Sequence, residues 1–180
     1  MSIPADRPYD AIGDAAAADI AGIAAVYAHH VRFGLGTFEE VPPDETEMAR
    51  RHAQVTALGL PYLVARRGPE ILGFAYAGLY RPRSAYRYTT EDSVYVAPGA
   101  IRRGVGHALL AEIVARCAAA GYRQMVAVIG DRDNLPSISL HRRSGFHEVG
   151  VAAGVGFKAG RWVDTVLMQR ALGPGSTCPP

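Results

Sequence analysis

The stretch "VYVAPGAIRRGVGHALL", residues 94–110, joins an apolar, strand-like run to the start of an amphipathic helix. The first backbone N–H groups of a helix lack partners and lie at the positive end of its dipole, so such a terminus favours an anion. Gly104 and Gly106 leave these amides open to a diphosphate, and three neighbouring side chains can add positive charge: Arg102, Arg103 and His107. The stretch predicts a phosphate-binding turn; the alternative is an ordinary strand-to-helix turn with incidental arginines.

The segments that follow predict a helix and then a strand. Apolar residues of the segment 105–119 stand four apart, as in an amphipathic helix packed on a sheet: Val105, Leu109, Ile113 and Cys117. "YRQMVAVIG", residues 122–130, has the continuous apolar centre of a strand buried on both faces. Because a strand, helix and strand normally form a right-handed parallel crossover, this strand should lie beside residues 93–97.

The other segments predict two further helices before the sheet and a third after it. Alanine-rich residues 13–31 predict a helix capped by Asp14. Residues 44–58 predict a second helix, because Asp44 three residues before Glu47 matches a capping box. The remaining expectations are two strands within 62–80 joined at Gly68 and Pro69, a strand at 88–96, a helix from Asn134 to Gly145, and two strands within 147–170.

Length and composition fit a single globular domain. The 180 residues are 49% hydrophobic, enough for one substantial core, which we place at 1–172, with "GPGSTCPP" at 173–180 as a disordered tail. The net charge of +2 is too small to predict a nucleic-acid groove. No membrane-length apolar run occurs, and Asp6 and Asp10 stand where a secretory signal would be basic, so we expect a cytoplasmic protein without a membrane partner.

Several motifs resemble one known family. "IRRGVG", residues 101–106, following "SVYV" resembles the acyl-CoA-binding motif of the GCN5-related N-acetyltransferase superfamily, although Ile101 stands where Gln or Arg is usual. Three longer segments resemble the phosphinothricin and methionine sulfoximine acetyltransferase branch: "RPRSAYRYTTEDSVYVAP" (81–98), "VAVIGDRDNLPSISLHRRSGF" (126–146) and "GFKAGRWVDTVLMQ" (156–169). Three separated motifs in the right order are more specific than one glycine turn.

The resemblance implies a fold and an activity. The fold is α/β, a strongly twisted mixed sheet of six to seven strands with flanking helices, in which two splayed parallel strands hold acetyl-CoA. The activity is acetyl transfer to the α-amino group of a small amino-acid analogue, by a homodimer that needs no metal. Two alternatives are the same scaffold acetylating a protein N-terminus, lysine or polyamine, and a non-catalytic acyl-CoA-binding module.

Acetyl transfer needs a neutral amine, a donor to the developing oxyanion and a proton source for the leaving thiolate. By resemblance Glu91 occupies the position of a catalytic glutamate that accepts the ammonium proton; the alternative is a solvated strand-end carboxylate. Asp92 should point to the opposite face, away from the cleft. A backbone N–H between Val94 and Val96 should serve the oxyanion. His141 is either the acid or a packed helix histidine.

The resemblance also assigns binding residues. Acetyl-CoA should contact the strand end and the following turn: Val94, Tyr95, Val96, Arg102, Arg103, Gly104, Val105, Gly106 and His107. Asn134 and Ser137 should bond the pantetheine arm, cap the last helix, or do both. Arg81 and Arg83 can form forked contacts to substrate oxygens. Phe38 and Tyr86 are either pocket walls or loop aromatics that pack only on their own loop. Two interpretations stand for Lys158, the one lysine among 19 basic residues: a side chain that faces the pocket, its own or that of a dimer partner, and a surface lysine.

Overall fold

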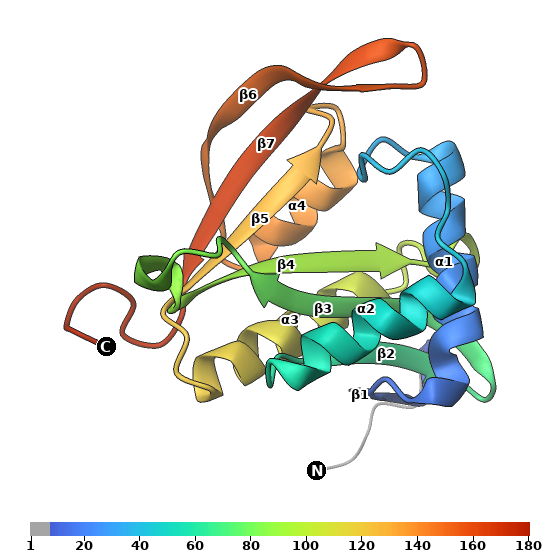
Figure 1. Ribbon diagram of the computed structural model, residues 1–180, viewed down its shortest axis with the longest axis horizontal. Coiled ribbons are helices and arrows are strands. Elements are labelled where there is room, and N and C mark those ends of the chain that lie inside the picture. Colours follow the sequence, from blue (N-terminus) through green and yellow to red (C-terminus); the bar gives the residue numbers. More distant parts are fainter. Residues whose placement is uncertain (1–7) are drawn as a thin grey trace.

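The computed structural model describes residues 8–180, which form one seven-stranded sheet with helices on both faces (Figure 1). Asp6 lies outside the described residues. The strand order is β1-β2-β3-β4-β5-β7-β6, and all pairs are antiparallel except β4 with β5. The mixed α/β architecture expected from the resemblance is therefore confirmed.

The element bounds match most of the segments expected from the sequence. The strands are β1 (Ala11–Asp14), β2 (Tyr62–Arg67), β3 (Glu70–Leu79), β4 (Thr89–Val96), β5 (Gln124–Gly130), β6 (His147–Lys158) and β7 (Arg161–Ala171). The helices are α1 (Ile20–Phe33), α2 (Glu45–Ala57), α3 (Val105–Ala119) and α4 (Leu135–Arg143). Three short 3-10 helices are η1 (Ala17–Asp19), η2 (Ser84–Tyr86) and η3 (Pro98–Ala100).

Alternating side chains divide the interior into two clusters. In β2, Leu63 and Ala65 pack on the α3 side of the sheet, whereas Tyr62 and Val64 pack on the α1 side. The same alternation, with period two, runs through β4, whereas in β3 it shifts between Leu72 and Phe74, opposite the irregularity at Ala65 and Arg66 of β2. The centre of the sheet is consequently buried on both faces, and the two faces near the end of β4 belong to different sets of helices.

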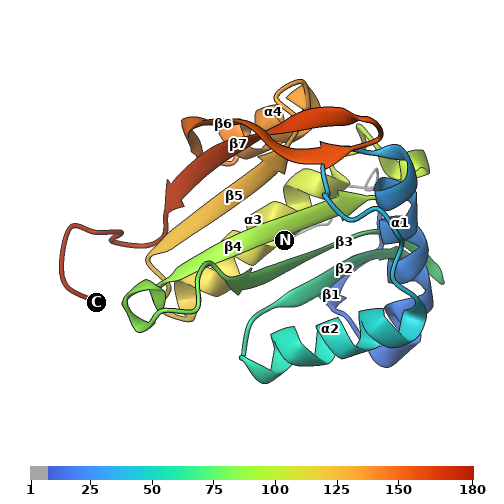
Figure 2. The same cartoon turned by 45° about the horizontal axis from the view of Figure 1, so that its top comes forward.

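The parallel pair is short. β4 and β5 pair only from Thr89↔Gln124 to Asp92↔Ala127, after which the two strands diverge (Figure 2). We expected β5 beside residues 93–97, and that register was wrong, since the pairing ends one residue earlier. β5 continues toward β7, which pairs with it over its whole length, while β4 stays with β3 through Val96. The fork between β4 and β5, beyond Asp92, is the opening that positions the candidate site.

The start of the first helix was wrongly predicted. Asp14 ends β1 opposite Leu63 and does not cap a helix. α1 begins at Ile20, after η1, and Asp19 binds the Arg66 side chain across the sheet edge. Alanine favours helix in any position, so composition alone did not separate the strand from the helix.

The other caps follow the sequence. Asp44 Oδ1 accepts from the Glu47 N–H at 2.8 Å at the start of α2. Residues 173–180, expected to be disordered, lie in turns beside Arg123, whose Nη2 donates to the carbonyls of Cys178 (3.2 Å) and Pro179 (2.8 Å). Both cysteines are free, with Cys117 buried and Cys178 exposed. Within residues 8–180, no helix has the length and apolar content needed to cross a membrane.

Candidate active site

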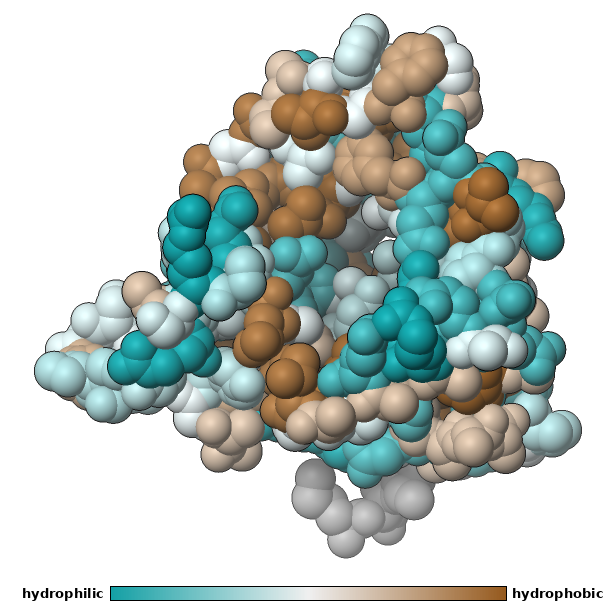
Figure 3. Space-filling model, viewed as in Figure 1, coloured by the Kyte–Doolittle hydropathy of each residue, from teal (hydrophilic) through white to brown (hydrophobic). Residues whose placement is uncertain are grey.

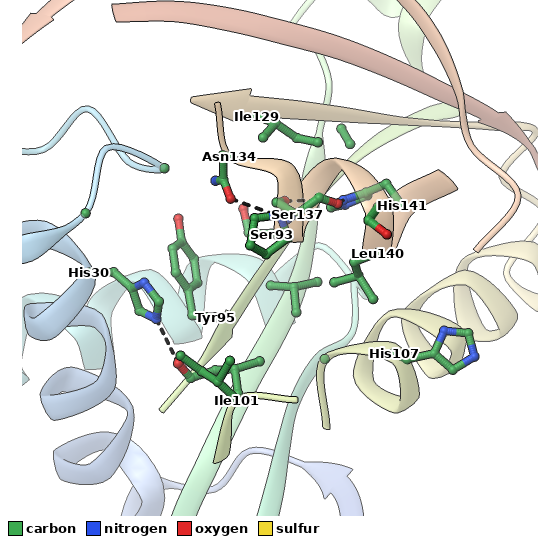
Figure 4. Close-up of a pocket in the computed structure, with 18 of the residues that line it drawn as sticks. His30, Ser93, Tyr95, Ile101, His107, Ile129, Asn134, Ser137, Leu140 and His141 are labelled. Carbon is green, nitrogen blue, oxygen red and sulfur yellow. Dashed lines mark hydrogen bonds between the residues drawn. The ribbon is translucent and has the colours of Figure 1, made fainter. Parts of the chain in front are cut away.

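A cleft of about 1230 Å³ opens where β4 and β5 diverge (Figure 4). Its floor is the end of β4 and the middle of β5, and its sides are the starts of α3 and α4 and the segment that follows α1. The structure brings eleven of the predicted site residues to its lining: Val94, Tyr95, Val96, Arg102, Gly104, Val105, Gly106, His107, Asn134, Ser137 and His141. Arg103 is exposed and does not line the cleft.

The turn before α3 has the backbone shape that its glycine permits. Gly104 precedes the helix with φ +82°, and a Cβ there would meet no protein atom within 4 Å. Arg102 also has positive φ, at 63°. Gly106 differs, because a Cβ would meet Val96 Cγ2 at 3.2 Å and Leu140 Cδ2 at 3.4 Å. Gly106 therefore also allows α3 to pack closely against β4 and α4, which the sequence argument did not include.

The start of α4 forms a second helix terminus at the cleft. The Asn134 side chain accepts from the Ser137 N–H at 3.3 Å, so the expected capping is present. A Cβ on Gly36 would lie 3.3 Å from Asn134 Nδ2, which places the segment after α1 directly against this terminus. Both helices turn the positive end of their dipole toward the same cleft, but the two termini differ. At α4 the Leu135 and Ser137 N–H groups already bond to Asp133 O and the Asn134 side chain, whereas the first N–H groups of α3 have no such partner among the described residues.

The end of β4 presents backbone groups to the cleft. In a strand, successive residues direct their N–H and C=O groups to opposite sides. Ala97 N–H donates to Leu72 O of the β3 side at 2.9 Å, whereas Val96 O accepts from His30 Nε2 at 2.9 Å. The alternation turns the N–H groups of Val94 and Val96 toward β5, beyond the last β4–β5 pair. These two amides are the structural counterparts of the expected oxyanion donors.

Asp92 and His141 form a buried pair at the fork. His141 Nε2 lies 3.0 Å from Asp92 Oδ2, and His141 Nδ1 lies 2.8 Å from Ser137 O. Burial acts to lower the pKa of His141, but the hydrogen bond and charge of Asp92 outweigh it, so the pKa is raised. Asp92 lines the cleft, and our expectation that it faces away was wrong. The alternation of β4 holds, but the cleft lies on the Asp92 side.

Glu91 lies on the other face of β4 and does not line this cleft. Burial raises the pKa of its carboxyl, the neighbouring Asp92 charge raises it further, and Arg81 opposes both. A carboxylate with a raised pKa, partly buried next to an opening in a sheet, is suited to accepting a proton.

The connection between β3 and β4 lies near Glu91. Arg81 sits over the Tyr80 ring at 4.9 Å, and Tyr86 meets the same ring edge-on at 5.7 Å. The charge of Glu91 acts on Arg81. Arg83 precedes η2 and is exposed. The structure therefore brings Arg81, Tyr86 and Glu91 into one neighbourhood and gives Arg83 no partner side chain among the described residues.

The segment 34–44 links α1 to the β6–β7 hairpin. Lys158 Nζ, nearly buried, donates to Thr37 O at 2.7 Å. Phe38 packs on β6 so closely that a Cβ on Gly156 would lie 2.0 Å from its ring. Burial lowers the pKa of Lys158, against the charges of Glu40 and Glu39. Lys158 is thus no surface lysine, and Phe38 packs on β6 as well as on its own segment.

Tyr76 is a site residue that the sequence analysis missed. It lies on β3 opposite Ser93 of β4, and the charges of Arg51, Glu39 and Glu91 all act on its hydroxyl. Burial is the main cause of its raised pKa. The alternation of β3 was the available signal. Within the described part of the chain, no cluster of three or more His, Cys, Asp or Glu side chains is arranged to hold a metal ion.

Comparison with known proteins assigns the chain and its fold to a family. Residues 23–146 match the family model described as the Acetyltransferase (GNAT) family. The chain belongs to the GNAT family. This GNAT chain is 57% identical over 162 residues to a phosphinothricin N-acetyltransferase of Alcaligenes faecalis, covering 90% of the chain and 82% of the relative.

Two further GNAT relatives extend the similarity. A Pseudomonas paraeruginosa L-methionine sulfoximine/L-methionine sulfone acetyltransferase is 40% identical over 172 residues, covering 93% of this chain and 98% of the relative. The crystal structure of a phosphinothricin acetyltransferase from Sinorhizobium meliloti in complex with AcCoA superposes with a TM-score of 0.91 at 47% identity, covering 94% of this chain and 92% of that one. The fork and the cleft therefore occur in a fold of established type.

Proposed function

We propose that this protein transfers the acetyl group of acetyl-CoA to the α-amino group of a small amino-acid analogue such as phosphinothricin, methionine sulfoximine or methionine sulfone. One observation carries the proposal. The fork in the sheet has two helix termini on one face and the partly buried Glu91 carboxylate on the other. Such an opening lets a thioester and an amine meet from opposite faces. The 57% and 40% identities to enzymes of this substrate class support it.

The residues of the cleft fit acetyl-CoA, which supplies an activated acetyl thioester. The N–H groups at the start of α3, with Gly104 in the left-handed region, suit the diphosphate, and Arg102 and His107 line the same wall. The N–H groups of Val94 and Val96 face the gap and suit the amide-bearing arm and the thioester oxygen. Asn134 and Ser137 border the arm from α4.

Glu91 accepts the proton that the substrate ammonium must lose. Its raised pKa, caused first by burial and then by the Asp92 charge, makes it a stronger base than an exposed carboxylate. His141 donates the proton that the leaving sulfur requires, because its raised pKa keeps the ring protonated closer to neutral pH. A purely packing role for His141 fits the two hydrogen bonds equally well. The pH dependence of kcat in Asp92→Asn and His141→Gln distinguishes the two roles.

Substrate selection rests on the face that holds Glu91. Arg81, beside Tyr86 and Glu91, binds the carboxylate or the distal oxygens of the substrate. Arg83, in the same β3–β4 connection, supplies a second guanidinium group for these oxygens. Phe38 closes the pocket from the segment 34–44. Lys158 fixes that segment through Thr37 O and has two further N–H groups for substrate oxygens.

We also propose a cytoplasmic homodimer with one catalytic domain per chain over residues 1–172. Large apolar side chains are exposed along the β6–β7 hairpin, and apolar surface gathers over these strands in Figure 3: Val149, Val151, Val155, Phe157 and Trp162. A surface of this kind is typical of a protein interface. Sedimentation of the purified chain tests it, and a monomer at micromolar concentration would reject the dimer.

Thiol release from acetyl-CoA tests the activity. The panel contains phosphinothricin, methionine sulfoximine, methionine sulfone, ordinary amino acids, polyamines and N-terminal peptides. We expect rapid turnover with the first three only. Rapid turnover with peptides or polyamines instead would favour the alternative acceptor, and acetyl-CoA binding with no turnover on any amine would leave a non-catalytic module.

A further inference from the structure

Asp92 occupies the point at which the sheet opens. Its pairing with Ala127 is the last between β4 and β5, and its side chain is 1% exposed. Oδ2 contacts His141 Nε2 at 3.0 Å, whereas Oδ1 is buried without a hydrogen-bond partner among the described residues. A buried carboxylate is costly unless a partner of opposite charge or several donors compensate for lost water. His141 is the group that can supply that compensation.

The contacts of His141 determine where its protons lie. Ser137 O can only accept, so His141 Nδ1 must carry a hydrogen to make the 2.8 Å contact. The second nitrogen, Nε2, faces a carboxylate oxygen, which also accepts when ionised. The imidazolium satisfies both contacts at once. The proton on Nε2 is therefore the one that titrates, and it lies at the fork.

Few other charged groups surround this pair. Glu91 is adjacent on β4 but lies on the other face. From α3, the Cys117 thiol is neutral, because burial and the Asp92 charge raise its pKa to about 11, although Thr90 opposes the shift. His107 contacts Ser144 Oγ at 3.4 Å instead of the pair. The Phe146 ring lies edge-on to the His141 ring, with 5.1 Å between the ring centroids. The last turn of α4 adds two exposed arginines, Arg142 and Arg143.

We propose that Asp92 is a positioning residue that holds the His141 ring with its Nε2–H at the fork. This inference rests on the proposed function. When the C–S bond breaks and the N–C bond forms, the sulfur takes the Nε2 proton and His141 becomes neutral with its hydrogen on Nδ1. The ammonium loses two protons in becoming an amide, one to Glu91 and one to water. Solvent then returns a proton to His141.

The Asp92→Asn variant separates this role from simple packing. The amide keeps the size of the side chain but removes its charge, so burial then dominates and lowers the pKa of His141. The alkaline limb of kcat should move to lower pH by about one unit or more, so the loss of activity should be about tenfold or larger on the alkaline side of the limb and small on its acid side. A loss of equal size at every pH would overturn the proposal.

Three controls keep the test decisive. Asp44→Asn makes the same chemical change at a distant helix cap and should leave the profile unchanged. His141→Gln should abolish the alkaline limb, and a limb that persists in this variant would overturn the proposal. NMR titration of the His141 ring in the enzyme without substrates should give a lower pKa in Asp92→Asn than in the parent. An unchanged pKa rejects the inference even if no amine is acetylated, whereas a lowered pKa supports it whatever the acceptor is.

Discussion

The two faces of β4 at the fork are built in different ways. On the α3 and α4 face, the cleft is made of backbone amides, a left-handed glycine and two helix starts, all within residues 92–141. On the Glu91 face, side chains meet from the segment 34–44, the β3–β4 connection and the β6–β7 hairpin. The first face consists mostly of backbone groups, with the segment after α1 along one side, whereas the second consists mostly of side chains from distant segments. A change on one face should consequently leave the other intact.

Glu91→Gln is the substitution from which we expect the largest effect, a loss of turnover that leaves the acetyl-CoA face intact. Turnover should fall by ~10²- to 10⁴-fold, the usual contribution of a general base, while the Kd for acetyl-CoA stays within about twofold. The melting temperature should rise, because the variant removes a carboxylate that burial and Asp92 disfavour. Steady-state kinetics, calorimetry and thermal unfolding measure the three quantities. Unchanged turnover would remove Glu91 from the mechanism.

Gly104→Glu should disrupt the acetyl-CoA face. A carboxylate at the diphosphate turn repels phosphate, and we expect the Kd for acetyl-CoA to rise by ~100-fold, equivalent to about 2.7 kcal/mol. Gly104→Ala is the matched control, because it shares the strain of φ +82° without the charge. A normal Kd in the glutamate variant would show that the diphosphate does not bind this turn.

The pH dependence of kcat/KM sharpens the assignment of the Glu91 face. Glu91 must be ionised to accept a proton, and its pKa is raised above the ordinary 4.5. Activity should thus be full above that raised pKa and fall by ~10-fold per pH unit below it. A profile that stays flat down to pH 4.5 would contradict this role. The Gln variant is the control, since its residual activity should lack this acid limb.

Gly156→Ala should give the smallest change, confined to the acceptor face. Its Cβ would collide with the Phe38 ring, so the segment 34–44 must move. We expect the KM for the amine to rise by roughly 3- to 10-fold, about 1 kcal/mol, with the Kd for acetyl-CoA unchanged. Gly150→Ala on the same strand is the control, because a Cβ there meets nothing within 4 Å. Equal effects of the two substitutions would argue against Phe38 as a pocket wall.

Sequence reasoning succeeded where the signal is local. The helix after the glycine turn begins at Val105 as expected, and Asn134 and Asp44 cap their helices, because a cap depends on residues within one turn. It failed at β1, where an alanine-rich segment carries no periodicity that separates strand from helix. β1 forms because residues 11–14 pair with a strand some fifty positions away.

The acceptor face lay mostly beyond sequence reasoning for the same reason. Phe38 and Lys158 were selected as single residues through a family resemblance. In the structure Phe38 packs against Gly156 and Lys158 bonds to Thr37 O, so each contact joins parts of the chain about 120 positions apart. The Asp92–His141 pair spans 49 positions. Alternation along β4 correctly separated Asp92 from Glu91, yet it did not say which face held the cleft.

The four-pair length of the β4–β5 ladder has a consequence for amide hydrogen exchange. The sheet halves β1–β4 and β5–β7 share strand hydrogen bonds only along this ladder, and the N–H groups of Val94 and Val96 face the gap beyond it. In the free enzyme β5 offers these two amides no acceptor, so they should exchange with deuterium faster than the rest of β4. A ligand arm in the gap would supply acceptors, and the exchange rate of both amides should fall on binding. The protein thus contains its own local reporter of occupancy, independent of catalysis.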